Sequence, residues 1–339
     1  MAQRYVFWLR FNGSCFNGFA KTGRNGFGGV LDLMDPLLKH VLEPRGFEGL
    51  RCSAGSRTDS GVHVLRGPVS VNTEKWKYLM DETPEIKTEI LNEFNSVLKD
   101  INHESLGVLD LHRVSSGFSL RKNVSYRKYV YRIRVAKSME IYNDCIKTPT
   151  LACFAERHHA WTLPPPFNIH KANEACKKLD GLKNLASFFK LPQRMQPLLP
   201  MRDKMTDRYV NLIQVIHGSE ISSVPDPNFE HYNLEVVSRS FLREQIRRMA
   251  TVIVQYAQGN ADPQAIDKLI QYPHPDTFTQ LKLNAAPAQG LFLVDCVYDP
   301  EMFMNPQPYC MHGWDDPNRE LVFENEEERA MWRKQNFWA

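Results

Sequence analysis

The feature that most constrains the fold is the recurrence of strand-like runs and amphipathic helical stretches along the chain. Aromatic and β-branched side chains, which favour strands, are concentrated in three early runs, residues 4–11, 67–71 and 126–135. Between these runs, helical spacing of apolar side chains predicts helices over residues 30–41 and 86–98. Pro36 is expected to interrupt the first helix or to mark its true first turn. Strands separated by helices predict an α+β fold, with a mixed or antiparallel sheet covered by helices.

A similar order of elements restarts after Pro164-Pro165-Pro166. The pattern predicts helices over residues 168–180 and 241–257 and strands over residues 210–216, 232–237 and 291–297. The two halves share element order but show no residue-level repeat. With about 150 residues per domain as a guide, we expect two α+β halves, residues 1–115 and 116–300. A C-terminal extension of unassigned role, residues 301–339, follows them.

Composition is ordinary for a soluble globular protein, with 42% hydrophobic and 24% charged residues. The formal net charge is only +3, so affinity for nucleic acid must come from local clusters of Lys and Arg, because screening limits phosphate attraction to roughly 10 Å. Three such clusters are Arg121-Lys122, Arg127-Lys128 with Arg132 and Arg134, and Arg243 with Arg247-Arg248. Each cluster, taken alone, is equally well explained as a solvated face.

The seven cysteines are scattered without a C-x-x-C pair, which indicates reduced thiols. Cys153 with His158-His159 is the nearest approach to a metal-ligand set, and ordinary strand and loop residues explain it better, so we predict no metal. Neither a G-x-G-x-x-G nor a G-x-x-x-x-G-K-[ST] motif is present, so no nucleotide cofactor is predicted.

Two observations bear on the compartment. No window approaches the roughly 18 uncharged apolar residues that span a bilayer, and a strand-like run begins almost at the N-terminus. We therefore expect no membrane association and no separate presequence. The expected compartment is intracellular, cytoplasmic or mitochondrial, with the nucleus left open.

Asp59 is the first candidate for chemistry. It lies in a short polar turn within Ala54–His63, flanked by glycine and serine and bracketed by strand-like runs. Such a turn can hold one carboxylate at the mouth of a sheet. A β-turn with an Asx cap is the structural alternative for this segment taken alone. Arg57 points elsewhere if the segment is extended, so it is not automatically the partner of Asp59.

Two further segments carry candidate residues. In the helix predicted from about residue 241, Arg247 lies at the edge of the apolar stripe and Arg248 further round it. A partly buried guanidinium there would need a carboxylate partner; a surface arginine with its stem packed down is the alternative. In the strand around residue 129, Tyr129 and Tyr131 share one face; tyrosine can stack on an extruded base, although strand tyrosines are often core residues.

Together these segments resemble the TruA family of tRNA pseudouridine synthases, over about residues 4–298. Six segments match in order: Phe11–Phe19 is similar to Y-D-G-x-x-F-x-G-W, Arg57–His63 to R-T-D-x-G-V-H, Phe118–Arg121 to F-x-A-R, Arg127–Tyr131 to R-x-Y-x-Y, Phe241–Arg247 to F-L-x-x-x-V-R, and Ala286–Leu293 to A-P-x-x-G-L-x-L. The shared order makes the resemblance specific.

The resemblance implies that Asp59 is the essential catalytic aspartate, with Arg247 as its ion-pair partner and Tyr129 stacked on the target base. Arg57 would belong to the loop that displaces the uridine. The matched segments also supply Thr58, His63 and Leu291 as candidates for substrate binding. Clustering of positive charge adds a hypothesis of our own, that the RNA phosphates are contacted by Lys21, Arg24, Arg121 and Arg243.

The same resemblance implies two RRM-like (ferredoxin-like) halves in one continuous mixed, mainly antiparallel sheet flanked by helices, with a central active-site cleft. It also implies a homodimer that binds one tRNA or other structured RNA, a substrate position in the anticodon stem-loop, and no cofactor. The chain departs from the family at Asn12, Phe19 and Val64, and residues 181–188 lack the G-x-H-D-F core. These departures indicate a divergent eukaryotic synthase-like branch.

One carboxylate is sufficient for pseudouridine formation, because the reaction only breaks the N1–C1′ bond, turns the uracil and rejoins it through C5. Arg247 would hold the Asp59 carboxylate in its ionised form. Two other functions compete with this hypothesis. A non-catalytic RNA-binding protein of the same fold would be favoured by loss of Asp59, Arg247 or Tyr129, and all three are present. A carboxylate glycosidase usually needs a second acidic motif, and the sequence has none of comparable strength.

Overall fold

The computed structural model describes residues 3–21, 28–147, 156–190, 206–218, 226–262, 264–306, 323 and 325–336. The chain forms two compact units, each assembled from separate stretches of sequence. Unit 1 comprises Met1–Arg132, Asp144–Thr162 and Pro287–His312, and unit 2 comprises Ile133–Asn143, Leu163–Ala286 and Gly313–Ala339. The division of the sequence into residues 1–115, 116–300 and 301–339 stays a prediction. It was drawn from the order of predicted helices and strands, whereas the two units are defined by contacts between residues.

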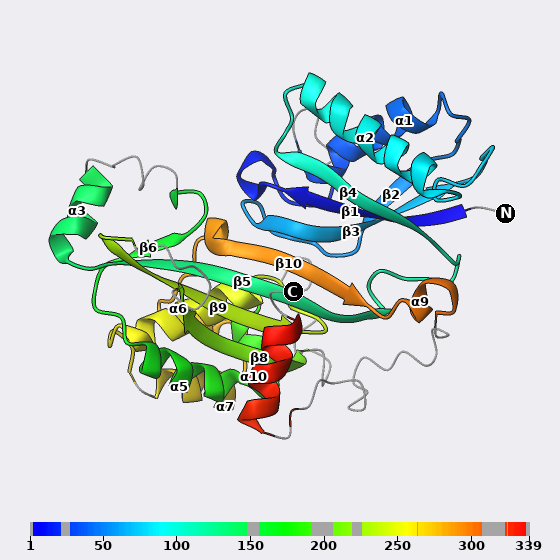
Figure 1. The fold of residues 1–339 in the computed structure, drawn as a ribbon. Coiled ribbons are helices and arrows are strands. Elements are labelled where there is room, and N and C mark those ends of the chain that lie inside the picture. The colour runs from blue at the N-terminus through cyan, green and yellow to red at the C-terminus, as the bar shows by residue number, and fades with distance from the viewer. Residues whose placement is uncertain are drawn as a thin grey trace. The chain divides into compact units, whose positions relative to one another are not determined.

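Unit 1 is built on a mixed, mainly antiparallel sheet with strand order β4-β1-β3-β10-β5 (Figure 1). Its strands are β1 (Gln3–Phe11), β2 (Arg51–Ala54), β3 (His63–Thr73), β4 (Leu106–Val114), β5 (Val124–Ala136), which continues into unit 2, and β10 (Leu291–Tyr298). The short strand β6 (Trp161–Leu163) pairs with β5. Strand β1 is antiparallel to β3 and β4, whereas β10 is parallel to β3 and antiparallel to β5. Strand β10 therefore joins the start of β3, where the Asp59 loop ends, to the tyrosine strand β5.

Helices α1 (Val30–Leu42) and α2 (Pro84–Asp100) lie together on one side of the unit 1 sheet in Figure 1. Thr83 caps α2 by accepting a hydrogen bond from the Ile86 backbone N–H at 3.3 Å. The buried face of α2 packs Phe94 edge-on against Phe7 of β1, with ring centroids 5.6 Å apart. The expectation for Pro36 was wrong: it lies inside α1, which continues through it. The buried apolar face of α1 outweighs the one backbone hydrogen bond that proline removes.

The remaining elements in the described part of unit 1 are short. They are the 3₁₀ turns η1 (Gly13–Cys15) and η5 (Ala288–Gly290) and the helix α9 (Glu301–Met304). Both 3₁₀ turns flank the ends of strands that surround the Asp59 loop, β1 and β10 respectively. They therefore bear directly on the candidate site.

In unit 2, strands β7 (Gly181–Asn184), β8 (Asp207–His217) and β9 (Phe229–Ser238) form antiparallel pairs in the order β9-β8-β7. Its helices are α5 (Ile169–Leu179), α6 (Gln245–Ala257), α7 (Ala265–Gln271), α8 (Thr277–Gln280) and α10 (Glu326–Asn336), with a 3₁₀ turn η2 (Ala186–Phe188) after β7. Helix α3 (Met139–Lys147) follows β5 and crosses the boundary between the units. Residues 181–188, which depart from the family motif, form β7 and η2.

Helix α6 begins at Gln245 and not near residue 241 as predicted. The residue before it, Glu244, has a left-handed backbone with φ 62°. This conformation lies outside the right-handed α region, so the helix cannot extend through Glu244 towards residue 241. Contacts with a distant segment hold Glu244 in place, because its carboxylate pairs with Lys190 at 3.3 Å. The start of α6 is thus set by tertiary contacts.

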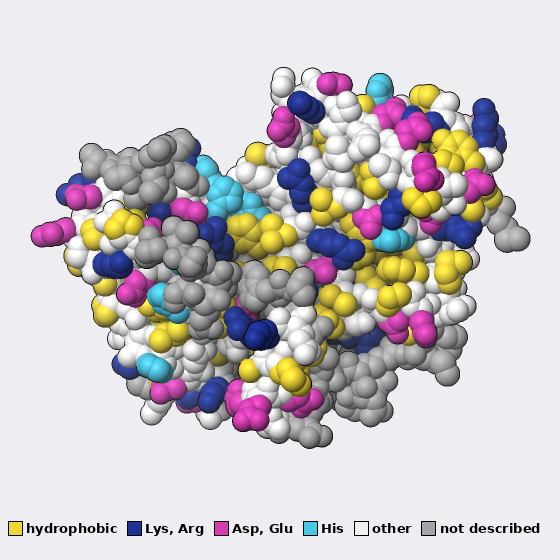
Figure 2. Space-filling model, in the orientation of Figure 1, with side chains coloured by type: hydrophobic (Ala, Val, Ile, Leu, Met, Phe, Trp, Pro, Cys, Tyr) yellow, Lys and Arg dark blue, Asp and Glu magenta, His cyan; other side chains and the backbone are white. Residues whose placement is uncertain are grey.

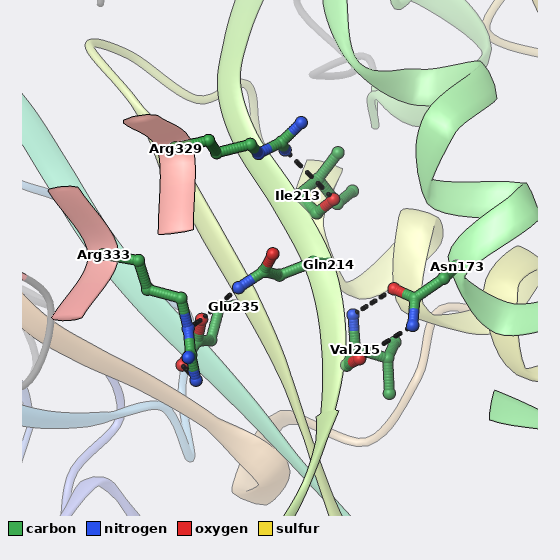
Figure 3. Close-up of polar contacts among 7 residues, drawn as sticks. All are labelled: Asn173, Ile213, Gln214, Val215, Glu235, Arg329 and Arg333. Carbon is green, nitrogen blue, oxygen red and sulfur yellow. Dashed lines mark hydrogen bonds and ion pairs between the residues drawn. The ribbon is translucent and has the colours of Figure 1, made fainter. Parts of the chain in front are cut away.

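Helix α10, in the extension to which the sequence assigned no role, lies against the unit 2 sheet (Figure 3). Arg333 forms two hydrogen bonds with the Glu235 carboxylate of β9, at 2.6 and 3.0 Å, and Gln214 of β8 donates to the same carboxylate at 2.9 Å. Arg329 pairs with Asp180 at 2.8 Å. Glu235 is fully buried, so α10 covers and neutralises a charge inside unit 2.

The α+β class predicted from the sequence is confirmed, with mainly antiparallel sheets and helices packed against them. The RRM-like halves, the single continuous sheet and the central cleft stay predictions. Among the helices of the described ranges, none is both long and apolar enough to cross a membrane.

Candidate active site

The Asp59 loop connects β2 to β3 in unit 1 and ends in a tight turn. The Val62 backbone N–H donates to the Asp59 carbonyl at 3.2 Å. Gly61 within the turn has φ +84°, a left-handed conformation that favours glycine. At the other end of the loop, the Gly55 N–H donates to Pro68 of β3 at 3.0 Å. Both ends of the loop are therefore tied to regular structure, with the half-buried Asp59 between them.

The opening segment after β1 packs directly onto this loop. A Cβ atom on Gly13 would lie 2.1 Å from the Val62 carbonyl oxygen, and one on Gly18, which has φ +99°, would lie 3.0 Å from the Thr58 oxygen. The Ser60 hydroxyl donates to the Phe16 carbonyl at 3.3 Å. Glycine at position 13 is therefore required sterically. This packing gives a physical reason why the opening motif, Phe11–Phe19, and the Asp59 motif, Arg57–His63, occur in the same chain.

His63, the last residue of the Asp59 motif, is buried, with 2% of its surface exposed. Its Nδ1 accepts a hydrogen bond from the Gly13 N–H at 3.2 Å, and its Nε2 lies 2.7 Å from the His158 carbonyl, to which it donates in the tautomer this network requires. The ring stacks on Phe292 of β10 at 4.5 Å. Burial lowers the pKa of His63 to about 4, so the ring is neutral near pH 7.

These contacts give His63 a positioning role, since it joins the opening segment, the Asp59 loop and β10. Both ring nitrogens are engaged by the protein's own backbone. Its predicted contact with substrate stays a prediction.

Tyr129 of β5 is also buried, with 6% of its surface exposed, and its backbone is paired with Leu293 of β10. Its hydroxyl lies 3.3 Å from the Ser56 hydroxyl in the Asp59 loop. Burial raises the pKa of Tyr129 to about 12, and the Asp59 carboxylate adds to that rise. Asp59 and a protonated tyrosine hydroxyl therefore lie within electrostatic range of each other in unit 1.

In unit 2, the half-buried Arg247 and the adjacent Arg248 have different surroundings. The Arg247 Nε donates to the Ala286 carbonyl at 2.7 Å, and the Ala286 N–H donates back to the Arg247 carbonyl at 3.2 Å. Arg248 is the more buried of the two, at 8% exposure, and lies 4.6 Å from the centre of the Phe278 ring. Arg248 thus packs within unit 2. The predicted ion pair between Arg247 and Asp59 joins residues of different units and stays a prediction.

The other predicted site residues differ in exposure. Arg57 and Arg121 are exposed in unit 1, and Arg243 is exposed in unit 2. Lys21 is exposed and paired with Asp35, so a phosphate would have to compete with that carboxylate. Arg24 lies outside the described residues.

Leu291 and Thr58 are less accessible than these arginines. Leu291 is buried, with its backbone paired to Tyr131. The Thr58 hydroxyl oxygen is buried without a hydrogen-bond partner among the described residues. A buried hydroxyl without a partner is uncommon in native proteins, and it marks Thr58 as a polar group available next to Asp59.

One of the predicted basic clusters, that of strand β5, is less solvated than a surface face requires. Arg127, Lys128 and Arg134 of β5 are 7%, 6% and 1% exposed. Burial lowers the pKa of Lys128, and the Arg134 guanidinium lies 4.3 Å from the centre of the Phe229 ring. On the face of the molecule drawn in Figure 2, coloured basic and acidic side chains are interspersed. Positive charge that could bind RNA phosphates is therefore expected in small groups of residues and not across this whole face.

One local concentration of positive charge surrounds a cavity of about 480 Å³ in unit 1, lined by Arg4, Arg57 and Arg121 together with Ser53, Ser70 and Asn72. Reasoning from the sequence missed Arg4 and the three neutral polar residues. Arg4 and Asn72 are paired across β1 and β3, and no local pattern indicates that pairing.

Within the described ranges, no group of three or more His, Cys, Asp or Glu side chains could hold a metal ion. Cys153, the cysteine of the weak metal-ligand set, lies outside those ranges. Among the cysteines that the structure describes, Cys15, Cys52, Cys176 and Cys296 are free thiols.

Comparison with known proteins identifies relatives of this arrangement. A family model described as tRNA pseudouridine synthase matches residues 175–299. The chain is 27% identical over 297 residues to tRNA pseudouridine synthase-like 1 of Homo sapiens, covering 87% of this chain and 90% of that protein. It is equally similar, at 27% over 297 residues, to the Xenopus laevis protein of the same name, of which 91% is covered. To tRNA pseudouridine synthase A of Thermus thermophilus it is 25% identical over 304 residues, covering 90% of this chain and all of that protein.

An α+β fold that presents one loop-borne aspartate beside a buried tyrosine, together with these relatives, supports the class of the protein: an isomerase of the pseudouridine synthase kind. Within that class, the comparisons support a TruA-like protein of a divergent eukaryotic synthase-like branch. The resemblance found in six short motifs is thereby confirmed at the level of family.

Proposed function

We propose that this protein converts uridine to pseudouridine in tRNA, with Asp59 as the catalytic carboxylate and without an external reactant. The observation that carries the proposal is the position of Asp59. It lies in a loop supported by glycine contacts from the opening segment and by the buried His63, within range of Tyr129. A carboxylate held in this way loses little orientational freedom when the substrate binds.

The reaction needs no net reactant. The N1–C1′ bond breaks, the uracil turns, and a C5–C1′ bond forms; C5 loses its proton and N1 gains one, so substrate and product are isomers. An ionised carboxylate at position 59 can attack the sugar, attack the base or abstract a sugar proton, and each route needs the charged form. We propose that Arg247 stabilises that form as an ion-pair partner.

Tyr129 supplies an aromatic surface and a protonated hydroxyl. Because burial holds the pKa of Tyr129 near 12, the hydroxyl stays neutral at physiological pH and does not add a second negative charge beside Asp59. We propose that its ring packs against the target uracil once the nucleotide has left the stack. Such stacking offsets part of the few kcal/mol that unstacking costs.

The decisive test is chemical mapping of pseudouridine in tRNA from cells with the protein, without it, and with Asp59→Asn in its place. We expect specific sites to disappear in the second and third cases. Glu74→Gln is the matched control, because it removes an exposed carboxylate of unit 1, 60% of whose side chain is exposed, and it should leave every site modified.

Three results would count against the proposal. If no site depends on the protein although tRNA binds, a non-catalytic RNA-binding function replaces it. If sites survive Asp59→Asn, the role of Asp59 is wrong. If the dependent sites lie outside tRNA, the substrate class is wrong.

Three finer features belong to the same proposal. We propose that the modified uridine lies in the anticodon stem-loop, which the same map tests directly. We propose that two copies of the chain bind one tRNA, which sedimentation of the complex tests through its mass. The compartment follows from whether cytoplasmic or mitochondrial tRNAs lose pseudouridine.

A further inference from the structure

The cavity lined by Arg4, Arg57 and Arg121 in unit 1 has an unusual balance of charge. Three arginines line it, and no aspartate or glutamate does. Its other polar lining includes the side chains of Ser53, Ser70 and Asn72, which can donate or accept hydrogen bonds. Within the described part of the chain, no carboxylate forms an ion pair with any of these three arginines.

Arg4 is held in a fixed orientation at one side of the cavity. Its Nε donates to the Asn72 amide oxygen at 2.7 Å, and one terminal nitrogen donates to the carbonyls of Ser116 and Phe118, both at 2.7 Å. All three acceptors are neutral, so they orient the guanidinium without cancelling its charge. An oriented, uncancelled guanidinium is a preorganised group for binding an anion.

The segment that carries Arg121 is anchored equally well. Phe118 is buried against Tyr298, with ring centroids 5.4 Å apart, and the Tyr298 hydroxyl donates to the Leu120 carbonyl at 2.7 Å. Leu120 in turn packs on the Asp59 loop, because a Cβ atom on Gly55 would lie 2.9 Å from the Leu120 Cβ. The cavity wall and the Asp59 loop therefore form one packed assembly.

Electrostatics agrees with this geometry. The pKa of Arg121 is lowered first by partial burial and then by the positive charges of Arg57 and Arg127. Like charges gathered without a counter-charge destabilise one another, and a bound anion relieves that repulsion.

We propose that this cavity is a phosphate-binding pocket that takes one nucleotide of the RNA next to the target uridine. The inference deepens the proposed function and rests on it. A volume of about 480 Å³ lies in the range of roughly 300–1,000 Å³ that suits small ligands, and a single nucleotide is of this size class. In this proposal Arg4, Arg57 and Arg121 supply the positive charge for the phosphate, and Ser53, Ser70 and Asn72 supply hydrogen-bonding groups for the sugar or base.

The pocket has a defined relation to the chemistry. Arg57 lines it, and Asp59, two residues further along, does not. A phosphate held by Arg57 therefore fixes the strand on one side of the loop and leaves Asp59 for the extruded uridine. Contacts of this kind set the register of the RNA without reading its sequence.

Binding measurements on the full-length chain carrying Asp59→Asn test the pocket independently of catalysis. Inorganic phosphate and uridine 5′-monophosphate are titrated by calorimetry, and total tRNA is titrated at several salt concentrations. We expect Arg121→Gln to weaken phosphate and nucleotide binding at least 10-fold and to reduce the salt slope of tRNA binding by about one ion. Arg51→Gln is the matched control, because Arg51 is exposed on the adjacent strand, pairs with Glu74 and does not line the cavity; it should change each affinity by less than about 2-fold.

Asn72→Asp is a second, independent variant. It places a carboxylate where the amide oxygen now accepts from Arg4, so the protein would carry its own counter-charge. We expect a thermal midpoint equal to or above that of the parent and a loss of nucleotide binding at least as large as that of Arg121→Gln.

The results separate the possible sources of phosphate. Loss of tRNA affinity together with the smaller salt slope assigns the pocket to the RNA backbone, whereas loss of nucleotide binding alone assigns it to a free nucleotide; both support a phosphate site. Equal binding of all three probes by Arg121→Gln, Asn72→Asp and Arg51→Gln would overturn the inference. Since these assays need no turnover, the pocket can be supported while the pseudouridine map fails, and the reverse.

Discussion

The arginines of the C-terminal helix α10 in unit 2 are matched by carboxylates of the same unit, whereas the arginines around the cavity in unit 1 are not. Arg333 binds the fully buried Glu235 through two hydrogen bonds. Arg57 and Arg121 face a cavity without an acidic residue in its wall. A guanidinium that is neutralised inside the chain contributes to the fold, and one left without a counter-charge beside a cavity is available to an outside anion.

The Asp59 loop differs from the α10 contact in a second respect. Close glycine packing and the neutral ring of His63 hold the loop, whereas ion pairs hold α10. A buried ion pair adds specificity of docking more reliably than it adds stability, because desolvation offsets much of the attraction. Three stability measurements test this contrast.

The largest effect is expected for Arg333→Ala. The change removes the cationic partner of the buried Glu235 carboxylate, to which Gln214 still donates, and breaking one side of a buried pair costs about 3–5 kcal/mol. Urea denaturation would measure this as a lower free energy of unfolding. The double variant Glu235→Gln with Arg333→Met is the control and should recover most of the loss. If Arg333→Ala unfolds within about 0.5 kcal/mol of the parent, the contact is not part of the fold.

The next effect concerns the pH dependence of stability conferred by His63. Its pKa is about 4 in the folded protein and about 6.5 in the unfolded chain, so the unfolded state binds the extra proton between these values. Stability is therefore present above pH 6.5 and is lost as the pH falls towards 4, by about 2.5 kcal/mol at pH 4.5.

His63→Gln isolates this term, because glutamine keeps a donor and an acceptor but does not titrate. Urea denaturation at several pH values should show the advantage of the parent over the variant shrinking between pH 6.5 and 4.5. A constant difference over that range would mean that His63 is not held neutral in the fold.

The smallest effect is expected for Arg51→Gln. Arg51 pairs with Glu74 at 3.0 Å, but both side chains are largely exposed, 78% and 60%. Water and salt screen such a pair, so the thermal midpoint should correspond to a loss within about 0.5 kcal/mol. A loss as large as that of Arg333→Ala would show that burial does not set the contribution of an arginine–carboxylate pair to stability.

Much of the secondary structure follows from local pattern. The strand predicted over residues 4–11 is β1 (Gln3–Phe11), and the helix predicted over 168–180 is α5 (Ile169–Leu179). These agree because side-chain periodicity reports which face of an element is buried. Strand β4 (Leu106–Val114) was not predicted, and its burial alternates only in part. Pairing with strand β1, and not its own side-chain pattern, therefore identifies β4 as a strand.

The candidate site divides in the same way. The order of short motifs was sufficient to single out Asp59, Tyr129 and Arg247, because each motif is local. Arg4 was missed, since its acceptor Phe118 lies 114 positions away in the sequence. Local sequence contains no information on such a pairing.

Local patterns in the sequence thus predicted the α+β class and the resemblance to the TruA synthases, and they supplied Asp59 as the candidate for chemistry. Only the tertiary structure decided which charges are matched. Arg333 reaches Glu235 across 98 positions of sequence, and His63 becomes neutral because segments from both ends of the chain bury it. The reason is physical: element type depends on neighbours three or four residues away, whereas desolvation and charge pairing depend on whatever the fold brings within a few ångströms.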